Sequence, residues 1–342
     1  MNRLLRSLVR RHSSTFHRNF SSSTSPACPV LKIEHLQQRQ MIFLAGDETS
    51  QFLQGLVTND MSHLERGNTA MYALFLNKGG RVMYDTIIYK EKNAKEGSFY
   101  VEVDAEVADQ VVKHLKLYRV RRKIEIEKTE NKKVWVVFDD DTEKKSKSIV
   151  LPKKNVETGI CCTDPRLKNL GTRLILDSNV GIDDIKSLFD VPEMVESNEN
   201  DYRKHRYRLG IGEGVQDLPQ GKAFPLEANV DYLNGVSFHK GCYVGQELTA
   251  RTHHTGVVRK RLMPLTFKTT LPNLLEPQTI DILNESEQNV GKLRGYCNGN
   301  GLALLRIEPA LAAKKLFANG IEVETRKPAW WPQNDDSSKH IR

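Results

Sequence analysis

The chain has 342 residues and a net charge of +8, from 51 lysines and arginines against 43 aspartates and glutamates. This length predicts two or three compact units, and a hydrophobic share of 39% is sufficient for buried cores. No apolar run has the length of a membrane span, so a helical membrane protein is excluded and we expect no membrane partner. The five cysteines form no CxxC pair, which excludes a disulfide framework and a closed zinc site and favours a reducing compartment.

The amino-terminal segment, residues 1–27, has the composition of a mitochondrial transit peptide. Residues 1–25 contain five arginines, many serines and no acidic residue, and leucine and valine recur beside the arginines at helical spacing. This composition is typical of organelle targeting, and we expect cleavage among residues 20–27. A disordered basic tail is the alternative. Without these five arginines the net charge falls from +8 to +3, so the basic balance is weak evidence for nucleic-acid binding.

Residues 28–138 are expected to form a first α+β part. Asp47 is expected to cap a helix whose buried side carries Phe52, Leu53, Leu56 and Val57. A second helix is expected over residues 105–118, and strands over residues 40–44, 69–76, 81–89, 98–103, 124–127 and 133–138. The sequence Asn77-Lys78-Gly79-Gly80 predicts a hairpin turn. Asp85 lies within the second hairpin strand, where an acidic side chain either faces solvent or belongs to a site.

Residues 139–258 are expected to form a second α+β part. It begins with a charged loop at 139–147, and the pair Cys161-Cys162 is expected in a later loop. A strand is expected over residues 172–176, and helices over residues 182–189, 197–209 and 247–255. The glycine-rich run at 210–214 follows a helix rather than a strand, which excludes a dinucleotide-binding fingerprint.

The basic run at residues 119–123 lies between a predicted helix and a predicted strand. Such a run is usually a solvated face, and an acidic partner or polyanionic ligand is the alternative. From residue 259 to residue 330 short strands alternate with turn residues, which predicts a small all-β unit. Its expected strands are residues 262–267, 279–283, 290–296, 302–307 and 321–325. The polar tail, residues 331–342, is expected to be disordered.

The most chemically dense stretch is residues 238–247, which combines a thiol, an ammonium, an imidazole, a carboxamide and a carboxylate with two glycines. Lys240 lies two residues from Cys242, and a nearby cation favours the thiolate, the form that binds soft metals. The alternative is a turn between a strand and a helix, with Cys242 as a small buried hydrophobe. The mixture favours a functional loop.

This stretch, with Ala250-Arg251 and the segment from Gly256 to Arg261, resembles the signature of the YgfZ family. These are folate-binding proteins related to the glycine-cleavage aminomethyltransferase, or T-protein, and their mitochondrial branch acts in iron–sulfur cluster assembly. Residues 52–60, the glycine hairpin before Asp85 and the pair Arg208-Leu209 also match, so the resemblance spans residues 35 to 330.

The resemblance implies an α+β fold, a T-protein-like ring of domains around a central pocket with a small carboxy-terminal β-barrel. It also implies a tetrahydrofolate-sized pocket, with candidates Asn59, Asp60, Tyr72, Asp85 and Arg208. A flat pterin would stack on the tyrosine, and the glutamate tail would meet a basic side chain. The signature loop that surrounds Cys242 comprises Lys240, Gly241, Tyr243, Gly245, Gln246, Glu247 and Arg251.

The chain departs from the transferase pattern at two acidic positions. T-proteins carry two adjacent acids where this chain has Tyr84-Asp85, and an acid where it has Gly210. Aminomethyl transfer needs acidic groups that orient the folate amine and handle its protons, so their loss favours a non-enzymatic role. The signature cysteine, which that reaction does not need, is present.

Three functions follow for this chain. The first is an assembly factor of the mitochondrial matrix that helps [4Fe–4S] enzymes mature. Cys242 would then ligate a [2Fe–2S] or [4Fe–4S] cluster shared with an A-type assembly partner, because one thiolate cannot fill a four-cysteine cluster site. The second is a folate-dependent aminomethyl or one-carbon transferase. The third is an RNA-binding module, which lacks interleaved aromatic residues.

Overall fold

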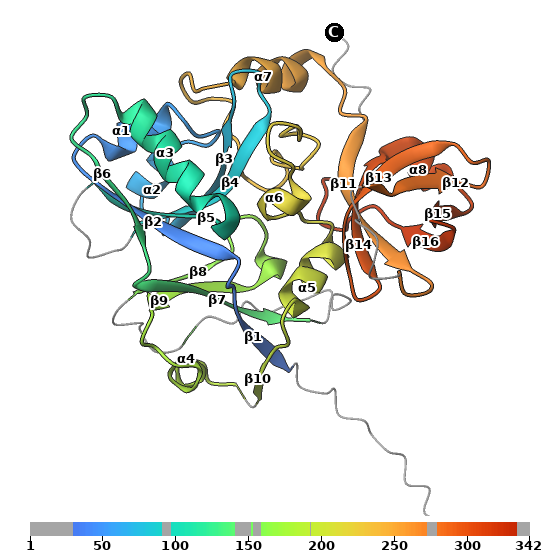
Figure 1. The fold of residues 1–342 in the computed structure, drawn as a ribbon, viewed down its shortest axis with the longest axis horizontal. Helices are drawn as coiled ribbons and strands as arrows, with labels where there is room; N and C mark the ends of the chain where they lie inside the picture. The colour runs from blue at the N-terminus through green and yellow to red at the C-terminus, as the bar shows by residue number, and fades with distance from the viewer. Residues whose placement is uncertain are drawn as a thin grey trace, which may run out of the picture.

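The computed structural model describes residues 30–90, 97–140, 152, 159–191, 193–271 and 279–333. The predicted transit peptide, most of the charged loop at 139–147 and most of the tail from residue 331 lie outside these ranges. Two five-stranded sheets and a closed barrel make up the described part of the chain (Figure 1).

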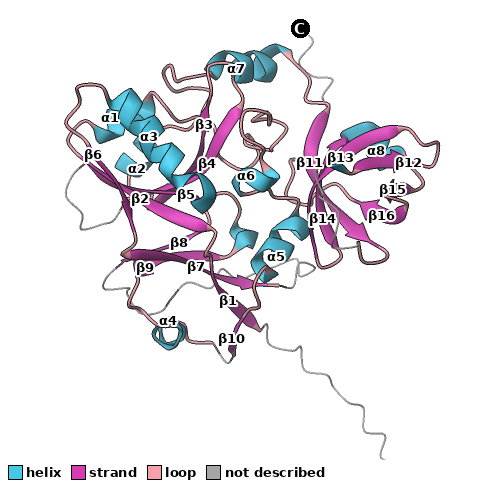
Figure 2. Ribbon diagram, in the orientation of Figure 1, coloured by secondary structure: helices cyan, strands magenta, loops and turns pink. Residues whose placement is uncertain are grey.

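The first sheet has the strand order β3-β4-β5-β2-β6 and is antiparallel throughout. Its strands are β2 (Arg39–Ala45), β3 (Ala70–Leu76), β4 (Val82–Tyr89), β5 (Ser98–Asp104) and β6 (Glu125–Thr129). Its helices are α1 (Thr49–Gln54), α2 (Ser62–Glu65), the 3₁₀ turn η1 (Ala105–Val107) and α3 (Ala108–Arg119). The helices pack on one face of this sheet, where Phe52, Leu53, Val111 and Leu115 share a core with sheet residues such as Ile42 (Figure 2).

The second sheet has the order β10-β1-β7-β9-β8, and only the β1–β10 pair in it is parallel. Its strands are β1 (Leu31–His35), β7 (Lys132–Asp139), β8 (Gly159–Thr163), β9 (Thr172–Asp177) and β10 (Met194–Glu196). The turn η2 (Lys168–Leu170) and helix α4 (Ile182–Leu188) belong to the same part. Strand β1 precedes the whole first sheet in the chain, so the two sheets interleave in sequence.

The barrel closes in the order β11-β14-β13-β12-β15-β16, with β16 paired to β11. Its elements are β11 (Lys260–Phe267), β12 (Asp281–Asn284), β13 (Asn289–Cys297), β14 (Asn300–Arg306), α8 (Ile307–Ala312), β15 (Leu316–Ala318) and β16 (Ile321–Thr325). Between the second sheet and the barrel come α5 (Asp201–Leu209), α6 (Gly214–Asp217) and α7 (Gln246–Thr255). Helix α5 contacts β11, β13 and β14, so it joins the barrel to the rest.

Three local predictions were wrong. Asp47 does not cap α1: Glu48 occupies the N-cap position without a side-chain cap bond. Cys161 and Cys162 lie in strand β8 rather than in a loop, because this strand pairs along its whole length with β9. The solvent-facing alternative for Asp85 is also wrong, since its side chain is only 3% exposed.

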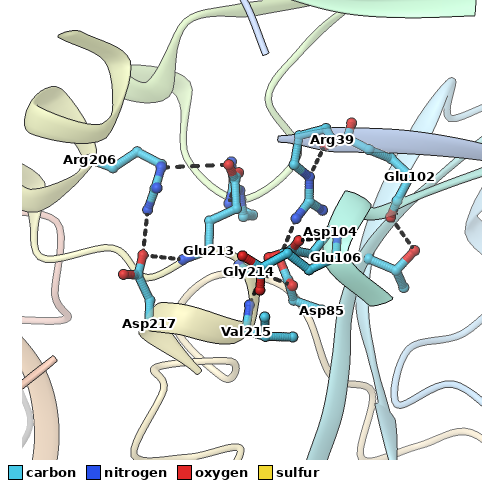
Figure 3. A network of polar contacts seen from close by, with 12 residues as sticks. Arg39, Asp85, Glu102, Asp104, Glu106, Arg206, Glu213, Gly214, Val215 and Asp217 are labelled. Carbon is cyan, nitrogen blue, oxygen red and sulfur yellow. Dashed lines mark hydrogen bonds and ion pairs between the residues drawn. The ribbon is translucent and has the colours of Figure 1, made fainter. Parts of the chain in front are cut away.

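The two sheets face each other through a layer that contains buried charges as well as hydrophobic side chains. Arg173 on β9 of the second sheet donates to Glu102 on β5 of the first sheet. It also donates to Asp164 at 2.9 Å and to Glu213 at 2.5 Å. Arg39 on β2 donates to the same Glu102 at 2.7 Å (Figure 3).

Glu213 and Asp217 extend this network toward the barrel. Arg166 lies 2.8 Å from Glu213, and Arg206 on α5 donates to Asp217 at 2.9 Å. Tyr207 also donates to Asp217, at 2.6 Å. Burial alone would raise the pKa of Glu213, but the surrounding guanidinium groups hold that pKa well below its usual value. The carboxylate is therefore ionised, with Oε2 bonded to Arg173 and Oε1 3.6 Å from the guanidinium of Arg206.

Replacing Arg173 is expected to damage the fold severely. The change Arg173→Met removes the one guanidinium that Glu102, Asp164 and Glu213 share, which leaves more buried negative than positive charge between the sheets. We therefore expect the free energy of unfolding to fall by about 3–5 kcal/mol. Urea unfolding followed by circular dichroism measures this. Lys128→Met, which removes an exposed pair with Asp109, is the control and should change stability by less than about 1 kcal/mol. Equal losses in the two variants would contradict the central role of the network.

Candidate functional site

The loop at residues 238–247 is anchored by the ammonium of Lys240. Its Nζ donates to the backbone oxygens of Gln54, Val57 and Asn59 at 2.7, 2.7 and 2.8 Å. These carbonyls lie at and just after the end of α1. Burial lowers the pKa of Lys240 to about 8, opposed by nearby Asp60. The ammonium thus holds the loop against the helical side of the first sheet.

The same loop rests on the β3–β4 hairpin turn, backbone against backbone. Gly245 has φ +78°, and a Cβ added there would lie 2.2 Å from the backbone oxygen of Asn77. Across the contact, a Cβ on Gly80 would lie 3.0 Å from the oxygen of Gly245. No other residue type fits at Gly245 without moving the hairpin. The close approach of the loop to the hairpin backbone therefore explains why glycine occupies position 245 of the signature.

Two further hydrogen bonds fix the loop. The backbone N–H of Val244 donates to the oxygen of Gly55 at 3.1 Å. The N–H of Tyr243 donates to Oε1 of Gln246 at 3.2 Å, and the Tyr243 side chain is buried. Gln246 begins α7, so its side chain ties the loop to the helix that follows.

Cys242 lies at the exposed point of this anchored loop. Gly241 beside it is also exposed, and a Cβ added there would meet no atom within 4 Å. Glu247 and Arg251 are exposed on α7. The interpretation of Cys242 as a small buried hydrophobe is therefore wrong, because its thiol side chain faces solvent on a well-supported backbone.

The other described cysteines have different surroundings. Cys161 and Cys162 on β8 are half-buried, and Cys297 on β13 is buried. Burial raises the pKa of the Cys161 thiol to about 12 and also raises those of Cys162 and Cys297. Of these four, only Cys242 is exposed and able to meet a partner without rearrangement of the core.

Nearby histidines do not complete a metal site. His253 stacks on Phe238 with ring centroids 3.6 Å apart, and His254 meets the same ring edge-on at 6.3 Å. Within the residues that the structure describes, no three histidine, cysteine, aspartate or glutamate side chains converge as a metal-binding group. Any ion or cluster at Cys242 would need ligands from elsewhere.

Four of the five folate-pocket candidates form side-chain hydrogen bonds with other groups of the protein. Asn59 donates to the backbone oxygens of Tyr72 and Asn234 and accepts from the N–H of Asp60. Asp60 itself accepts from Gln54 and from the N–H of Ser62, beside the Lys240 anchor. The ring of Tyr72 is 1% exposed.

The last two candidates lie on different sides of the molecule's polar interior. Asp85 accepts from Arg39 at 3.3 Å and from the N–H of Gly214 at 3.1 Å, so both its oxygens are engaged (Figure 3). Burial raises its pKa, and Arg39 opposes this rise. Arg208 instead donates to Asp140 at 3.0 Å, and its neighbour Arg206 reaches the buried network.

These contacts test whether folate fits the residues named for it. The cavity beside Arg39, Asp104 and Glu213 has a volume of about 70 Å³. Sites for drug-sized ligands measure roughly 300–1,000 Å³. None of the five candidates lines this cavity. Asn59, Asp60, Asp85 and Arg208 would each have to give up a hydrogen bond to protein before contacting a folate.

Sequence reasoning missed most of the buried network. Glu102 and Asp104 alternate along β5 with Val101 and Val103, whose side chains join the helix-covered core. This alternation is typical of a strand with one solvated face. The second sheet covers that face instead. The isolated acid in Gly212-Glu213-Gly214 was the one available signal, because a carboxylate between glycines suits no helix or strand.

The fold resembles a known enzyme structure. The glycine cleavage system aminomethyltransferase T from Bartonella henselae matches with a TM-score of 0.67 over 89% of this chain and 87% of that chain, at 12% sequence identity. This confirms the α+β, T-protein-like fold with a carboxy-terminal barrel. At this identity the likeness concerns the fold alone.

Sequence comparisons identify the protein family to which this chain belongs. Residues 259–333 match the family model described as the CAF17 C-terminal beta-barrel domain. The iron-sulfur cluster assembly factor IBA57, mitochondrial, of Mus musculus is 39% identical over 310 residues, covering 87% of this chain and 84% of that protein. The protein of the same name from Homo sapiens is 38% identical over 308 residues, with the same coverage. This chain therefore belongs to the IBA57 family of mitochondrial iron–sulfur cluster assembly factors.

Proposed function

We propose that this chain acts in the mitochondrial matrix with an A-type assembly partner to help [4Fe–4S] enzymes mature. In this proposal Cys242 supplies one thiolate to an iron–sulfur cluster that the two proteins hold jointly. The cluster is cargo, which passes to a recipient enzyme. The observation that carries the proposal is an exposed cysteine on a loop fixed by Lys240 and Gly245.

The number of ligands explains why the cluster is shared. Iron–sulfur clusters are held by four protein ligands, usually cysteine thiolates. Cys242 is one, and the described residues around it offer no convergent set of further ligands. The remaining ligands must come from the partner, so the complete site exists only in the complex. Recipient enzymes then compete for a cluster whose ligands are divided between two chains.

The surroundings of Asp85 favour assembly over aminomethyl transfer. A proton-handling acid needs an oxygen free to meet the substrate. Both oxygens of Asp85 are bonded, to Arg39 and to the N–H of Gly214, and the side chain is buried. Gly210, at the second acidic position of the T-proteins, has no side chain and φ +76°. The transferase alternative therefore has neither acid available.

Removing the thiol is expected to abolish the shared cluster. We would mix the mature protein anaerobically with an A-type partner carrying a [2Fe–2S] cluster, and follow complex formation by visible circular dichroism and size exclusion. The wild type should form a heteromeric complex whose visible circular dichroism differs from that of the partner alone, and Cys242→Ser should leave the partner's spectrum unchanged. Cys161→Ser, a cysteine in strand β8, is the control and should behave as wild type. The same spectral change with Cys242→Ser would refute ligation by this residue.

Moving the loop without touching the thiol should also weaken the complex. Gly245→Ala places a Cβ 2.2 Å from the oxygen of Asn77, at a backbone conformation that side chains disfavour, so the loop must shift. We expect at least about tenfold weaker complex formation, a change of about 1.4 kcal/mol. The matched control is Gly241→Ala, where the added Cβ meets nothing within 4 Å. Equal affinities in the two variants would mean that loop position does not matter.

Folate binding stays a prediction, and the proposal includes no step through it. Since the named pocket residues are bonded to protein, we expect saturating tetrahydrofolate to leave formation of the coloured complex unchanged. Calorimetric titration with tetrahydrofolate, followed by the circular dichroism assay on the loaded protein, measures both points. Folate-dependent gain or loss of the complex would make the ligand part of assembly, and turnover of an aminomethyl donor would restore the transferase hypothesis.

A further inference from the structure

A cleft of about 800 Å³ lies beside the connector that joins α7 to the barrel. The connector, residues 257–260, forms one wall, and the start of α8 and the segment ending at Trp331 contribute to the others. Figure 1 shows how the connector runs from the end of α7 into β11. This volume accommodates several side chains of a bound segment.

The charge of the cleft is strongly one-sided. Four basic residues line it, and one acidic residue, Glu308, opposes them. The basic residues are Arg259, Lys260, Arg306 and Lys327. In the described ranges none of these four side chains has an acidic group within ion-pair distance, although most cations of the buried core are paired. Unpaired cations gathered in a concave surface attract an anionic partner.

The cleft also exposes hydrophobic surface. Val257 is 54% exposed and Leu311 is 42% exposed, and both line it. Across the described residues, only three other large hydrophobic side chains, Val30, Leu117 and Val120, are exposed to this degree. Two of these five thus share one concave surface, and apolar groups surrounded by polar ones mark interaction sites.

We propose that this cleft binds an acidic segment, with at least one bulky apolar side chain, of the protein that shares the cluster with Cys242. This inference rests on the proposed function. The basic residues would pair with the segment's carboxylates, and its apolar side chain would cover Val257 and Leu311. The cleft supplies steering and affinity, whereas the cysteine supplies a ligand.

The position of the cleft supports a single partner for both sites. The Cys242 loop precedes α7 and the connector follows it, so the ten residues of Gln246–Thr255 separate them. A helix rises about 1.5 Å per residue, which puts the two sites roughly 15 Å apart along this axis. An interface of standard size covers both ends of such a helix.

Other occupants explain the cleft less well. Single-stranded RNA needs aromatic faces for base stacking, and the one aromatic lining residue, Trp331, is only 4% exposed. The chain's own end, residues 334–342, begins close to Trp331, but its two aspartates are offset by one lysine and one arginine. A separate acidic segment therefore complements the charge better.

The first test measures peptide binding by fluorescence anisotropy. The probe is a labelled octapeptide of aspartates and glutamates with two leucines, compared with a version whose leucines are alanines. Wild type should bind the leucine peptide more tightly, and affinity should fall with added salt. The double variant Arg259→Glu, Lys327→Glu should lose at least about tenfold in affinity. Absence of binding to wild type would overturn the proposal.

A matched control makes the same charge change elsewhere. Arg121→Glu with Lys123→Glu alters the exposed basic run after α3, outside the cleft, and should keep wild-type peptide affinity. Equal losses of peptide affinity in both double variants would mean that only net charge matters, and would refute binding of the segment in the cleft. A chain ending at Gln333 should also bind as wild type. A tenfold gain on this truncation would assign the cleft to the chain's own end instead.

A second test separates this inference from the proposed function. The apo form of the A-type partner, which carries no cluster, should bind wild type and Cys242→Ser equally but bind the cleft variant at least about tenfold more weakly. If wild type forms no coloured complex yet binds the apo partner through the cleft, the shared-cluster proposal is refuted and the docking role of the cleft is supported. If the coloured complex forms equally well with the cleft variant, the docking role of the cleft is refuted and cluster ligation by Cys242 is supported. Displacement of the peptide by a short RNA would also refute the proposal.

Discussion

The position of Arg173 between the two sheets is the constraint on which the rest of the structure depends. A guanidinium in a protein interior is tolerated only when acidic groups surround it. Glu102 comes from β5 of the first sheet, and Asp164 directly follows β8 of the second sheet. Glu213 comes from the segment before α6. The charges therefore fix the register of one sheet on the other more specifically than hydrophobic packing alone would. They also fix the chain between α5 and α6, because Glu213 and Asp217 must reach the same network.

This arrangement separates the buried interior from the chemistry-bearing surface. In the interior, Asp85 bonds to Arg39 and to the N–H of Gly214, while the buried atoms Arg39 Nη2 and Glu213 Oε1 make no hydrogen bond to the described residues. At the surface, the β3–β4 hairpin offers a rigid platform to the Cys242 loop, through the contact of Gly80 with Gly245. A thiolate that must meet another protein's cluster needs exposure, and a ligand that must be oriented needs a stiff backbone. The loop combines these because three backbone carbonyls hold the Lys240 ammonium and Gly245 packs directly on the hairpin backbone.

Much of the fold could be predicted from the sequence where the signals are local. The hairpin turn at Asn77–Gly80, helix α7 and five of the barrel strands follow from turn residues and periodicity. Strand β10 does not, since its pairing partner β1 lies far away in sequence. Strand β15 was missed because it has only three residues, although it forms a tight hairpin with the adjacent β16. The buried network was missed for a physical reason: alternation along β5 shows that Glu102 and Val101 face opposite sides, but not whether water or a second sheet covers the polar side. The functional role of the signature loop stays a prediction. Sequence spacing linked Lys240 to Cys242, whereas the structure shows its ammonium bonded to carbonyls at the end of α1.

The proposed division of the cluster's ligands between two chains would have a consequence for release. A cluster bound entirely by one protein leaves only when several bonds to that protein break. A cluster held by Cys242 on one side and by a partner on the other loses part of its ligand set as soon as the proteins separate. Protein–protein affinity then controls how long the cluster is held, and surface charges away from the metal tune that affinity and its association rate. Helix α7 has the cysteine loop at its beginning and the basic cleft at its end, so in this proposal one helix would set the distance between the cluster ligand and the docking surface.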